Sequence, residues 1–380
     1  MSELSYLEKL LDGAEVEWMT LGNEGVVEIA NSGRKPVKAS MRTTGKVPYY
    51  GANNIQDYVD GYTHDGEFVL IAEDGSASLD NYSIQYVTGK FWANNHVHVV
   101  RGKGRLNSRF LYHYLSIVNF VPFLSGGGRA KLTKGKLVEI PIPIPCPGNP
   151  EKSLAIQSEI VRILDTFTAL TAELTAELTA RKKQYNYYRD RLLSFDDGVV
   201  EWITLGEIAE FRRGTAITKK QTKSGNIPVV ANGPVPTYFH AEQNREGETI
   251  VIARSGAYAG YVSFWVQPIF LTDAFSIHPD ARIIKPRFLY HLLQNKQQHI
   301  QDMKKGAGVP HIRIKELELY SLPKPSIREQ TRIISILDKF DTLTSSITEG
   351  LPREIELRQK QYEYYRDLLF SFPKPESVNN

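Results

Sequence analysis

The 380-residue sequence contains a single cysteine, Cys146, and this scarcity excludes several kinds of site. One cysteine can form neither an intramolecular disulfide nor a zinc site built from two or more thiolates. No stretch approaches eighteen consecutive apolar residues, so no membrane-spanning helix is expected. The opening MSELSYLEKLLDG carries acidic residues and no long apolar run, which is unlike a secretory signal. These absences predict a cytoplasmic protein.

Sequence patterns of catalytic sites are also missing. No GxxxxGK[ST] loop is present, and Gly126-Gly127-Gly128 is followed by Arg-Ala-Lys rather than by an apolar helix. His96 and His98 would share one face of a strand, but no third metal ligand is suggested nearby, so satisfied strand histidines are the favoured interpretation. We therefore expect no catalysis, no metal and no cofactor in this chain. The net charge of +3 permits nucleic-acid binding without indicating it.

Self-similarity is what the sequence does have. Val16–Gly22 recurs as Val200–Gly206, and Phe110-Leu-Tyr-His returns at position 288. The octet that starts at Lys183, KQYNYYRD, matches KQYEYYRD from Lys360 at seven of eight positions. The chain is thus a tandem duplication. Residues 26–100 and 209–280 match only at scattered positions, which indicates one scaffold that carries two different recognition surfaces.

Each repeat ends in a long stretch of helical periodicity. Apolar residues alternate in steps of four and three over more than four heptads, as in coiled coils. About forty residues at 1.5 Å rise span roughly 60 Å, which is longer than a small domain. The expected seam consists of Ile160, Phe167, Leu170, Tyr185, Tyr188, Leu192, Ile333, Phe340, Leu343, Tyr362, Tyr365 and Leu369.

The stretches before the helices favour short strands and turns, typical of α+β domains. The predicted architecture is α+β: two globular domains separated by two long helices. The expected boundaries are a first domain at 1–150 with a short N-terminal helix, a helix at 151–197, a second domain at 198–325, a helix at 326–373 and a flexible tail at 374–380.

Basic and amide side chains gather at equivalent positions of the two repeats, around Gly-rich stretches that start at Ser125 and Lys304. Arg and Lys neutralise phosphates, Asn reads adenine edges, and Arg reads guanine. An ordinary solvated basic loop is the alternative for any single cluster. The DNA-binding candidates of the first domain are Arg34, Lys35, Arg42, Asn53, Asn54, Arg129, Lys131, Lys134 and Lys136. Those of the second are Arg212, Arg213, Lys219, Lys220, Asn232, Arg254, Lys305, His311, Arg313 and Lys315.

Charged residues between the seam positions could contact a protein partner, with a solvated helix face as the alternative. The candidates are Arg181, Lys183, Arg189, Arg358, Lys360 and Arg366.

The order of these motifs resembles the specificity subunits of type I restriction–modification enzymes. The resemblance covers essentially the whole chain and rests on the exit Pro-Ile-Pro-Ile-Pro, the helix with Ile-Leu-Asp165-Thr-Phe167 and the octet at Lys183. The tandem Thr171-Ala-Glu-Leu and Thr175-Ala-Glu-Leu is similar to the tetrapeptide repeats of the IC subclass.

The resemblance implies a non-catalytic subunit of a site-specific adenine methyltransferase and endonuclease complex. Each domain would be a target recognition domain that reads one half of a bipartite double-stranded DNA sequence. The helices would pack antiparallel as spacers in a circular, pseudo-twofold arrangement. They would dock two modification (methyltransferase) subunits and, through them, the restriction (motor-nuclease) subunits. S-adenosylmethionine, ATP and magnesium would belong to those partners.

Two other classes remain open at this point. One is a stand-alone DNA-binding regulator with two recognition domains, and the other is a coiled-coil scaffold that contacts only proteins.

Overall fold

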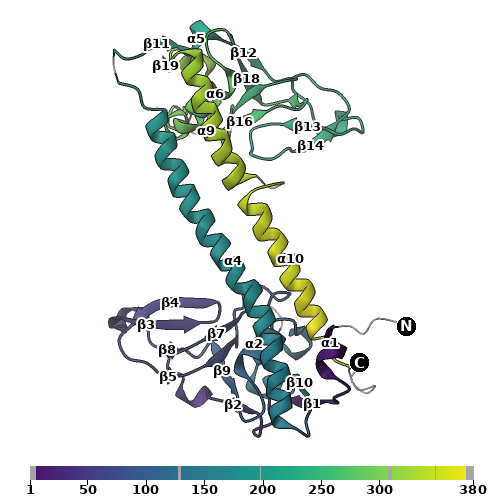
Figure 1. The fold of residues 1–380 in the computed structure, drawn as a ribbon. Helices are drawn as coiled ribbons and strands as arrows, with labels where there is room; N and C mark the ends of the chain where they lie inside the picture. Colours follow the sequence, from purple (N-terminus) through teal and green to yellow (C-terminus); the bar gives the residue numbers. More distant parts are fainter. Residues whose placement is uncertain (1–5, 127–129, 197, 307–309, 347, 374–380) are drawn as a thin grey trace, which may run out of the picture. The chain divides into compact units, whose positions relative to one another are not determined.

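The computed structural model describes residues 6–126, 130–196, 198–306, 310–346 and 348–373 (Figure 1). The expected tail at 374–380 and the candidate Arg129 lie outside these residues. The chain divides into two compact units: Met1–Glu173 with Ile355–Asn380, and Leu174–Glu354. In the part of the chain so described, no helix is long and apolar enough to cross a membrane.

The first unit contains the first globular domain. Its helices and 3-10 turns are α1 Tyr6–Leu11, η1 Asn31–Gly33, η2 Ala39–Met41, α2 Ser108–Leu115, η3 Val121–Phe123 and α3 Lys134–Leu137. Its strands are β1 Val16–Thr20, β2 Val27–Ile29, β3 Thr44–Gly51, β4 Asn54–Val59, β5 His64–Asp65, β6 Phe68–Ala72, β7 Ile84–Val87, β8 Lys90–Ala93, β9 Val97–Gly102 and β10 Pro141–Pro145.

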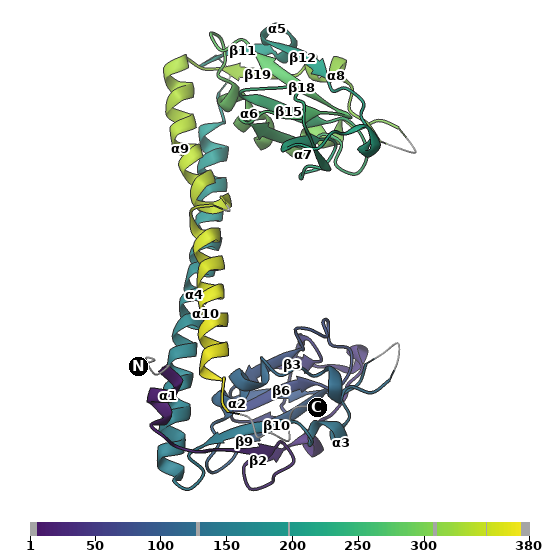
Figure 2. The same cartoon turned by 90° about the vertical axis from the view of Figure 1, so that its right-hand side faces the viewer.

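These strands form two four-stranded sheets, ordered β2-β9-β6-β7 and β4-β3-β8-β5, and a separate pair β1-β10. The central strand β6, Phe-Val-Leu-Ile-Ala, is buried at every position, as expected for β-branched and aromatic residues covered on both faces. Asn107 caps α2 by accepting hydrogen bonds from the backbone N–H groups of Arg109 and Phe110. The helix α1 lies against α4 (Figure 2), where Tyr6 contacts Glu159.

The second unit contains the second globular domain. Its helices and turns are α5 Leu205–Ile208, η4 Lys219–Gln221, α6 Pro286–Asn295, α7 Gln297–Asp302 and α8 Ile314–Glu318. Its strands are β11 Glu201–Thr204, β12 Ala209–Arg213, β13 Ile227–Val230, β14 Tyr238–His240, β15 Thr249–Ala253, β16 Val262–Trp265, β17 Phe270–Leu271, β18 Ala274–Pro279 and β19 Ser321–Lys324. The main sheet has the order β12-β18-β15-β16, and β14-β13-β17 and β11-β19 stand beside it. Both domains are α+β, as predicted.

Three long helices follow the domains: α4 Pro150–Leu192, α9 Ile327–Ser345 and α10 Leu351–Leu369. The expectation of one continuous second helix over 326–373 is wrong, because α9 ends before α10 begins. Ser346 has extended backbone angles, Gly350 has a φ of +81°, and Pro352 occupies the first turn of α10. A Cβ at position 350 would lie 2.3 Å from the Thr342 carbonyl oxygen, so the turn requires glycine. Proline also disfavours helical backbone at the residue before it.

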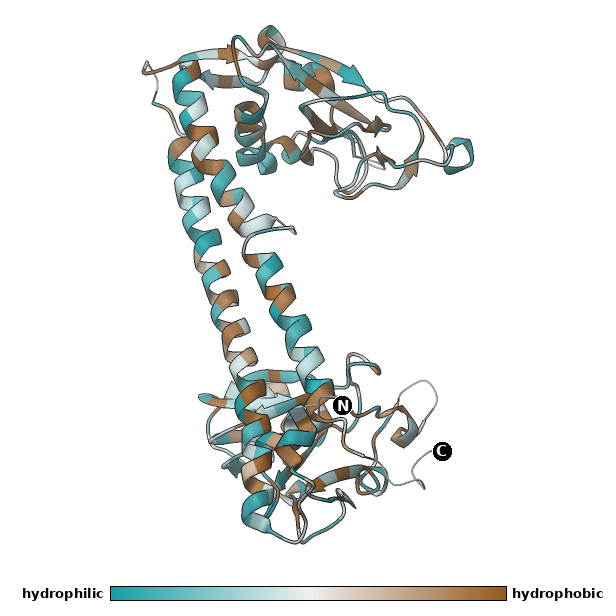
Figure 3. Ribbon diagram, turned by 45° about the vertical axis from the view of Figure 1, so that its right-hand side comes forward, coloured by the Kyte–Doolittle hydropathy of each residue, from teal (hydrophilic) through white to brown (hydrophobic). Residues whose placement is uncertain are grey.

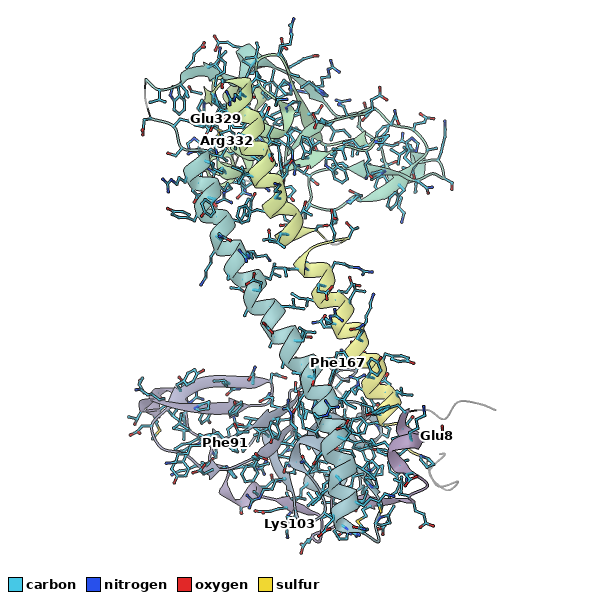
Figure 4. All side chains as sticks on the ribbon, in the orientation of Figure 1. Glu8, Phe91, Lys103, Phe167, Glu329 and Arg332 are labelled. Atoms are coloured by element: carbon cyan, nitrogen blue, oxygen red, sulfur yellow. The ribbon has the colours of Figure 1, made fainter. Side chains whose placement is uncertain are left out.

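The long helices pack antiparallel within each unit. In the first, Phe167 of α4 stacks on Tyr365 of α10 with ring centroids 5.3 Å apart (Figure 4), while Ile160 shares a buried cluster with Leu369. In the second, Tyr188 stacks on Phe340 of α9 at 5.9 Å. Each unit therefore combines a domain with helical segments from both repeats. This reciprocal composition agrees with the predicted circular arrangement.

The predicted seam is correct in part. Ile160, Ile333, Leu369 and Tyr185 are buried. Phe167, Leu170, Leu192, Phe340, Leu343 and Tyr362 are half-buried. Tyr188 and Tyr365 are stacked yet remain 39% and 40% exposed, so their expected burial is wrong. The most buried positions also include residues that the seam missed, namely Leu164, Leu193 and Leu337. Hydrophobic and hydrophilic residues alternate along α4 (Figure 3).

Candidate nucleic-acid interface

A basic cleft in the second domain brings together five of its ten predicted DNA-binding residues. Its cationic lining comes from the end of β12, the residue after β15 and the loop that leads into α8: Arg213, Arg254, His311, Arg313 and Lys315. Backbone hydrogen bonds fix this loop, since the N–H of Ile312 donates to the Arg254 carbonyl (2.9 Å) and the N–H of Gly256 to the Pro310 carbonyl (3.0 Å). The apolar lining is Phe275, Ile312 and Ile314.

The cations of this cleft are only partly neutralised. Arg254 donates to Asp273 at 2.7 and 3.1 Å, and the same carboxylate accepts from Ser255 at 2.7 Å. Arg213, Arg313 and Lys315 form no ion pair with any residue that the structure describes. Neighbouring like charges repel each other unless an anion approaches. The cleft is therefore suited to a polyanion.

The other candidates of the second domain are less available. Arg212 makes a two-pronged contact with Glu210 at 2.9 and 2.7 Å, and Lys305 pairs with Glu316 at 2.6 Å. The amide of Asn232 donates to Asp273 at 3.2 Å. Lys219 and Lys220 on η4 are exposed and have no ion pair within the described ranges.

The equivalent position of the first domain carries the opposite charge. Leu132 N–H donates to the Glu73 carbonyl as Ile312 does to that of Arg254, so Glu73 corresponds to Arg254. Arg34 and Lys131 (3.0 Å) both pair with Glu73. Burial raises the pKa of Glu73, but the hydrogen bonds from the two cations outweigh it and hold that pKa below its ordinary value. Arg34 and Lys131, which were predicted to contact DNA, therefore already have an acidic partner inside the domain.

Other candidates of the first domain also have structural partners. Arg42 lies 4.2 Å from the ring centroid of Tyr49 and pairs with Asp57. Asn53 donates to Gly75 and accepts from Ala77 and Ser83. Lys136 pairs with Glu139, and Lys134 lines a cleft that also contains Glu24 and Glu28. Lys35 and Asn54 remain exposed.

A partly buried junction, with a fully buried histidine, joins each domain to its helix, and the sequence did not reveal its role. In the first unit Asp165 of α4 accepts from Arg109 and His113, each at 2.8 Å, and in the second Asp338 of α9 accepts from Arg287 (2.7 Å) and His291 (2.8 Å). The repeated Phe-Leu-Tyr-His was its visible signal, because it places Arg and His one helical turn apart.

A buried glutamine completes each junction eight residues earlier. Gln157 accepts from the Asn107 N–H (2.8 Å) and donates to the Arg105 carbonyl (2.7 Å). Gln330 accepts from the Lys285 N–H (2.8 Å) and donates to the Ile283 carbonyl (3.1 Å). A buried polar group without such a partner would cost about 1–3 kcal/mol. The same hydrogen bonds therefore set the entry to α2 and α6.

Comparison with known proteins decides the family. A family model described as the type I restriction modification DNA specificity domain matches residues 15–181 and 199–357. The chain belongs to this specificity family. It is similar to a putative type I restriction enzyme specificity subunit of Haemophilus influenzae, with 48% identity over 97% of this chain and 98% of that protein. It is 41% identical to the EcoR124I/EcoR124II specificity subunit of Escherichia coli over the full length of both.

The fold is similar to that of a solved type I S subunit from M. genitalium, with a TM-score of 0.68 at 20% identity over 96% of this chain and 98% of the other. The family confirms the resemblance predicted from the sequence and the tandem repeat of specificity domains. The chain is a DNA specificity subunit of the type I restriction–modification class rather than a catalytic subunit.

In this specificity subunit two of the partner-docking candidates pack inside their own unit. Arg189 and Arg366, whose side chains are 23% and 20% exposed, lie over Tyr185 and Tyr362 at 5.7 Å and pair with the next aspartate. Their side chains therefore lie against tyrosines of their own unit, and their docking role stays a prediction. Arg181 pairs with Glu177, Lys360 pairs with Glu356, and Arg358 donates to Gln361. Lys183 is exposed and has no ion pair in the part of the chain described.

The histidines considered as metal ligands in this specificity subunit have other partners. His98 is buried and contacts Asn31 and the Leu132 carbonyl, and His96 contacts Asp74. Among the described residues, one group of possible metal ligands, His291, Asp338 and Asp341, lies within 4.8 Å. Arg287 already bonds to both carboxylates, so a cation would compete with a guanidinium for them.

Acid is expected to destabilise the first junction through His113. Burial lowers the pKa of His113 to about 4, whereas an unfolded histidine titrates near 6.5. The unfolded state therefore binds more protons between these values, and stability should fall as the pH drops from about 6.5 towards 4. The upper limit is about 3 kcal/mol. Thermal melts between pH 7.5 and 5 should show a smaller shift for His113→Gln, and equal shifts for both proteins would contradict this assignment.

Proposed function

We propose that this specificity subunit reads a bipartite double-stranded DNA target, with one recognition domain on each half. The observation that carries the proposal is the cleft of Arg213, Arg254, His311, Arg313 and Lys315, where three cations lack an ion pair among the described residues. Arg and Lys side chains neutralise phosphates and hydrogen-bond to guanine. The repeated junction supports the two-domain design, because it attaches two domains with different surfaces to their helices through the same contacts.

The long helices, in this proposal, separate the domains and dock two modification subunits, which in turn recruit the motor-nuclease subunits. One solved relative with a TM-score of 0.56 belongs to work on the assembly of the type I R-M system, which makes assembly a natural role to test. S-adenosylmethionine, ATP and magnesium would bind to those partners. The Thr-Ala-Glu-Leu tandem supports assignment to the IC-like subclass.

The decisive experiment is reconstitution. The modification subunit is assayed for methyl transfer to DNA with and without this chain, and methylated sites are mapped. Site-specific methylation only in its presence, at a sequence with two defined halves, is the expected result. A stand-alone regulator would bind DNA without conferring methylation, and a protein-only scaffold would bind no DNA. Either outcome would overturn the proposal.

A charge reversal tests partner docking by the helices. Lys183→Glu is expected to weaken co-purification with the modification subunit by roughly tenfold, because an exposed lysine at an interface loses its attraction and gains repulsion. The melting temperature should stay unchanged, since Lys183 has no ion pair within the described residues. Asn186→Lys, at another exposed position of α4, is a charge-changing control. A variant that melts earlier would show that Lys183 serves the fold instead.

A further inference from the structure

We propose that the β3–β4 hairpin of the first domain is a DNA-reading ribbon, in which the exposed side chains of Asn54, Gln56 and Tyr58 on β4 meet the bases. The proposal rests on the proposed function and names the readers of one half-site. Several other DNA-binding candidates of the first domain already have partners inside that domain. Arg34 and Lys131 pair with Glu73, and Asn53 hydrogen-bonds to Gly75, so these three side chains are poorly placed to read bases.

The hairpin presents a free strand. The strand β4 is the edge of the sheet β4-β3-β8-β5, and it pairs with β3 from Thr44↔Val59 to Gly51↔Asn54. The pairing steps from Tyr49↔Asp57 to Tyr50↔Ile55, so β4 has a bulge at Gln56, which interrupts the alternation of side chains along the strand. Asn54, Gln56 and Tyr58 lie before, at and after this bulge. All three are exposed, and Tyr58 is 51% exposed. Asp57, which pairs with Arg42, and the buried Val59 anchor the same strand to the domain. The hairpin extends from the rest of its domain (Figure 1).

The amides of Asn54 and Gln56 on β4 keep most of their hydrogen-bonding capacity. Asn54 accepts from the N–H of Ile55, and its amide NH₂ group has no partner among the described residues. Gln56 makes one long contact, 3.5 Å from Asn94. A Cβ at Gly51 would lie only 2.0 Å from the Gln56 amide nitrogen, so glycine lets this side chain lie across the ribbon. Asn and Gln amides can bond to adenine in a bidentate manner.

Lysines surround the same sheet without acidic partners. Lys35, Lys38, Lys46 and Lys90 are exposed and form no ion pair within the residues that the structure describes. Lys90 lies 4.6 Å from the ring centroid of the exposed Tyr62, and Lys35 lies 5.9 Å from that of Trp92. Lysines beside a protruding ribbon can bind the phosphates that flank a groove.

The ribbon has the right form for direct readout. The major groove of B-DNA admits a two-stranded β-ribbon, and base edges there carry a distinct pattern of donors and acceptors. The corresponding pair in the second domain is much shorter, since β13 and β14 pair only from Ile227↔His240 to Val229↔Tyr238. The two domains thus reach DNA differently: the first through a ribbon and the second through a basic cleft.

The test uses the complete methyltransferase complex and a library of duplexes with randomised half-sites. Asn54→Ala with Gln56→Ala should reduce discrimination at positions of one half-site by roughly 5- to 150-fold, with the other half-site and the spacer unchanged. Gln56→Glu should move the preference at its position from adenine to cytosine, because a carboxylate accepts from the cytosine amino group. Lys46→Ala should weaken binding to all sequences and lower the salt slope by about one unit.

Gln298→Ala, an exposed amide on α7 of the second domain, is the matched control and should change nothing. Thermal melts of each complex separate misfolding from lost contacts. Unchanged base preference in both the double variant and Gln56→Glu would overturn the ribbon. If Arg313→Ala still weakens binding in that case, only the ribbon fails. If the unmodified complex shows no sequence preference at all, the proposed function fails with it.

Discussion

Inserting one further Thr-Ala-Glu-Leu after Leu178 is expected to lengthen the nonspecific spacer of the DNA target and to leave both half-sites unchanged. Four residues add about 6 Å of helix and about 40° of rotation beyond a full turn. DNA rises 3.4 Å and turns about 35° per base pair, so length suggests nearly two pairs and rotation one. Rotation should dominate, because each domain must face its groove. We therefore expect one additional base pair, with two as the upper limit.

The structure supports the choice of position. The first buried cluster takes its last α4 residue at Leu164, and the second takes its first at Tyr185. An insertion after Leu178 falls between them and leaves both cores intact. The boundary between the two units, Glu173 to Leu174, lies in the same tandem. Inserting Thr-Ala-Glu-Leu after Leu164 instead would shift buried residues within the first cluster and is the destabilising control.

Mapping methylated sites of the unmodified and inserted proteins side by side measures the spacer directly. Active protein with the original spacing would refute the role of α4 as a ruler, as would altered half-sites.

Removing two of the three unpaired cations of the second domain's cleft is expected to weaken DNA binding by roughly a hundredfold at low salt. Hydrogen bonds to charged groups contribute about 1.5–3 kcal/mol each, and Arg313→Ala with Lys315→Ala removes two such donors. If both contact phosphates, affinity falls for all sequences, and the slope of log affinity against log salt decreases by nearly two units. If Arg313 reads guanine instead, preference at one position relaxes and the slope changes by about one.

Arg212→Ala is the matched control, because Arg212 already contacts Glu210 with two nitrogen atoms. It should alter the slope little. Stability separates a binding role from a structural one: removing mutually repelling cations should leave the melting temperature unchanged or raise it. A lower melting temperature together with unchanged DNA affinity would show that these residues support the loop before α8 and do not bind DNA.

The sequence predicted the architecture well because periodicity and repetition are local signals. The α+β domains and α4 follow from patterns in the chain, whereas the reciprocal design was implied by the resemblance to the family. The break between α9 and α10 was missed although Gly350 and Pro352 are visible, because the apolar spacing continues on both sides. The predicted seam steps from Ile160 to Phe167, whereas the domain core also buries Leu164 between them. Tertiary contacts, not spacing, decide which side of a helix is covered.

The candidate site was harder to predict, because the sequence around a basic residue does not show whether an acidic residue pairs with it in the fold. Arg34 and Arg313 look alike in sequence, yet Glu73 holds the first and no described acid holds the second. Glu73 lies 39 positions from Arg34, and no local pattern joins them. Exposed amides such as Gln56 carry equally little local signal. What the sequence supplied was a set of basic and amide candidates, and the fold shows which of them already have partners inside their own domain.

The paired glutamine and aspartate of each junction make the recognition domains exchangeable. Gln157 and Asp165 hold a backbone N–H, an arginine and a histidine, and Gln330 and Asp338 hold the same three groups. The junction requires only these three groups from the domain and contacts few of its strands. We therefore expect that a foreign domain with an Arg-x-x-x-His helix can be grafted without any change to the long helices. If the domains are exchanged in this way, recombination between the two repeats would give new target sequences and leave the helix surfaces proposed for assembly unchanged.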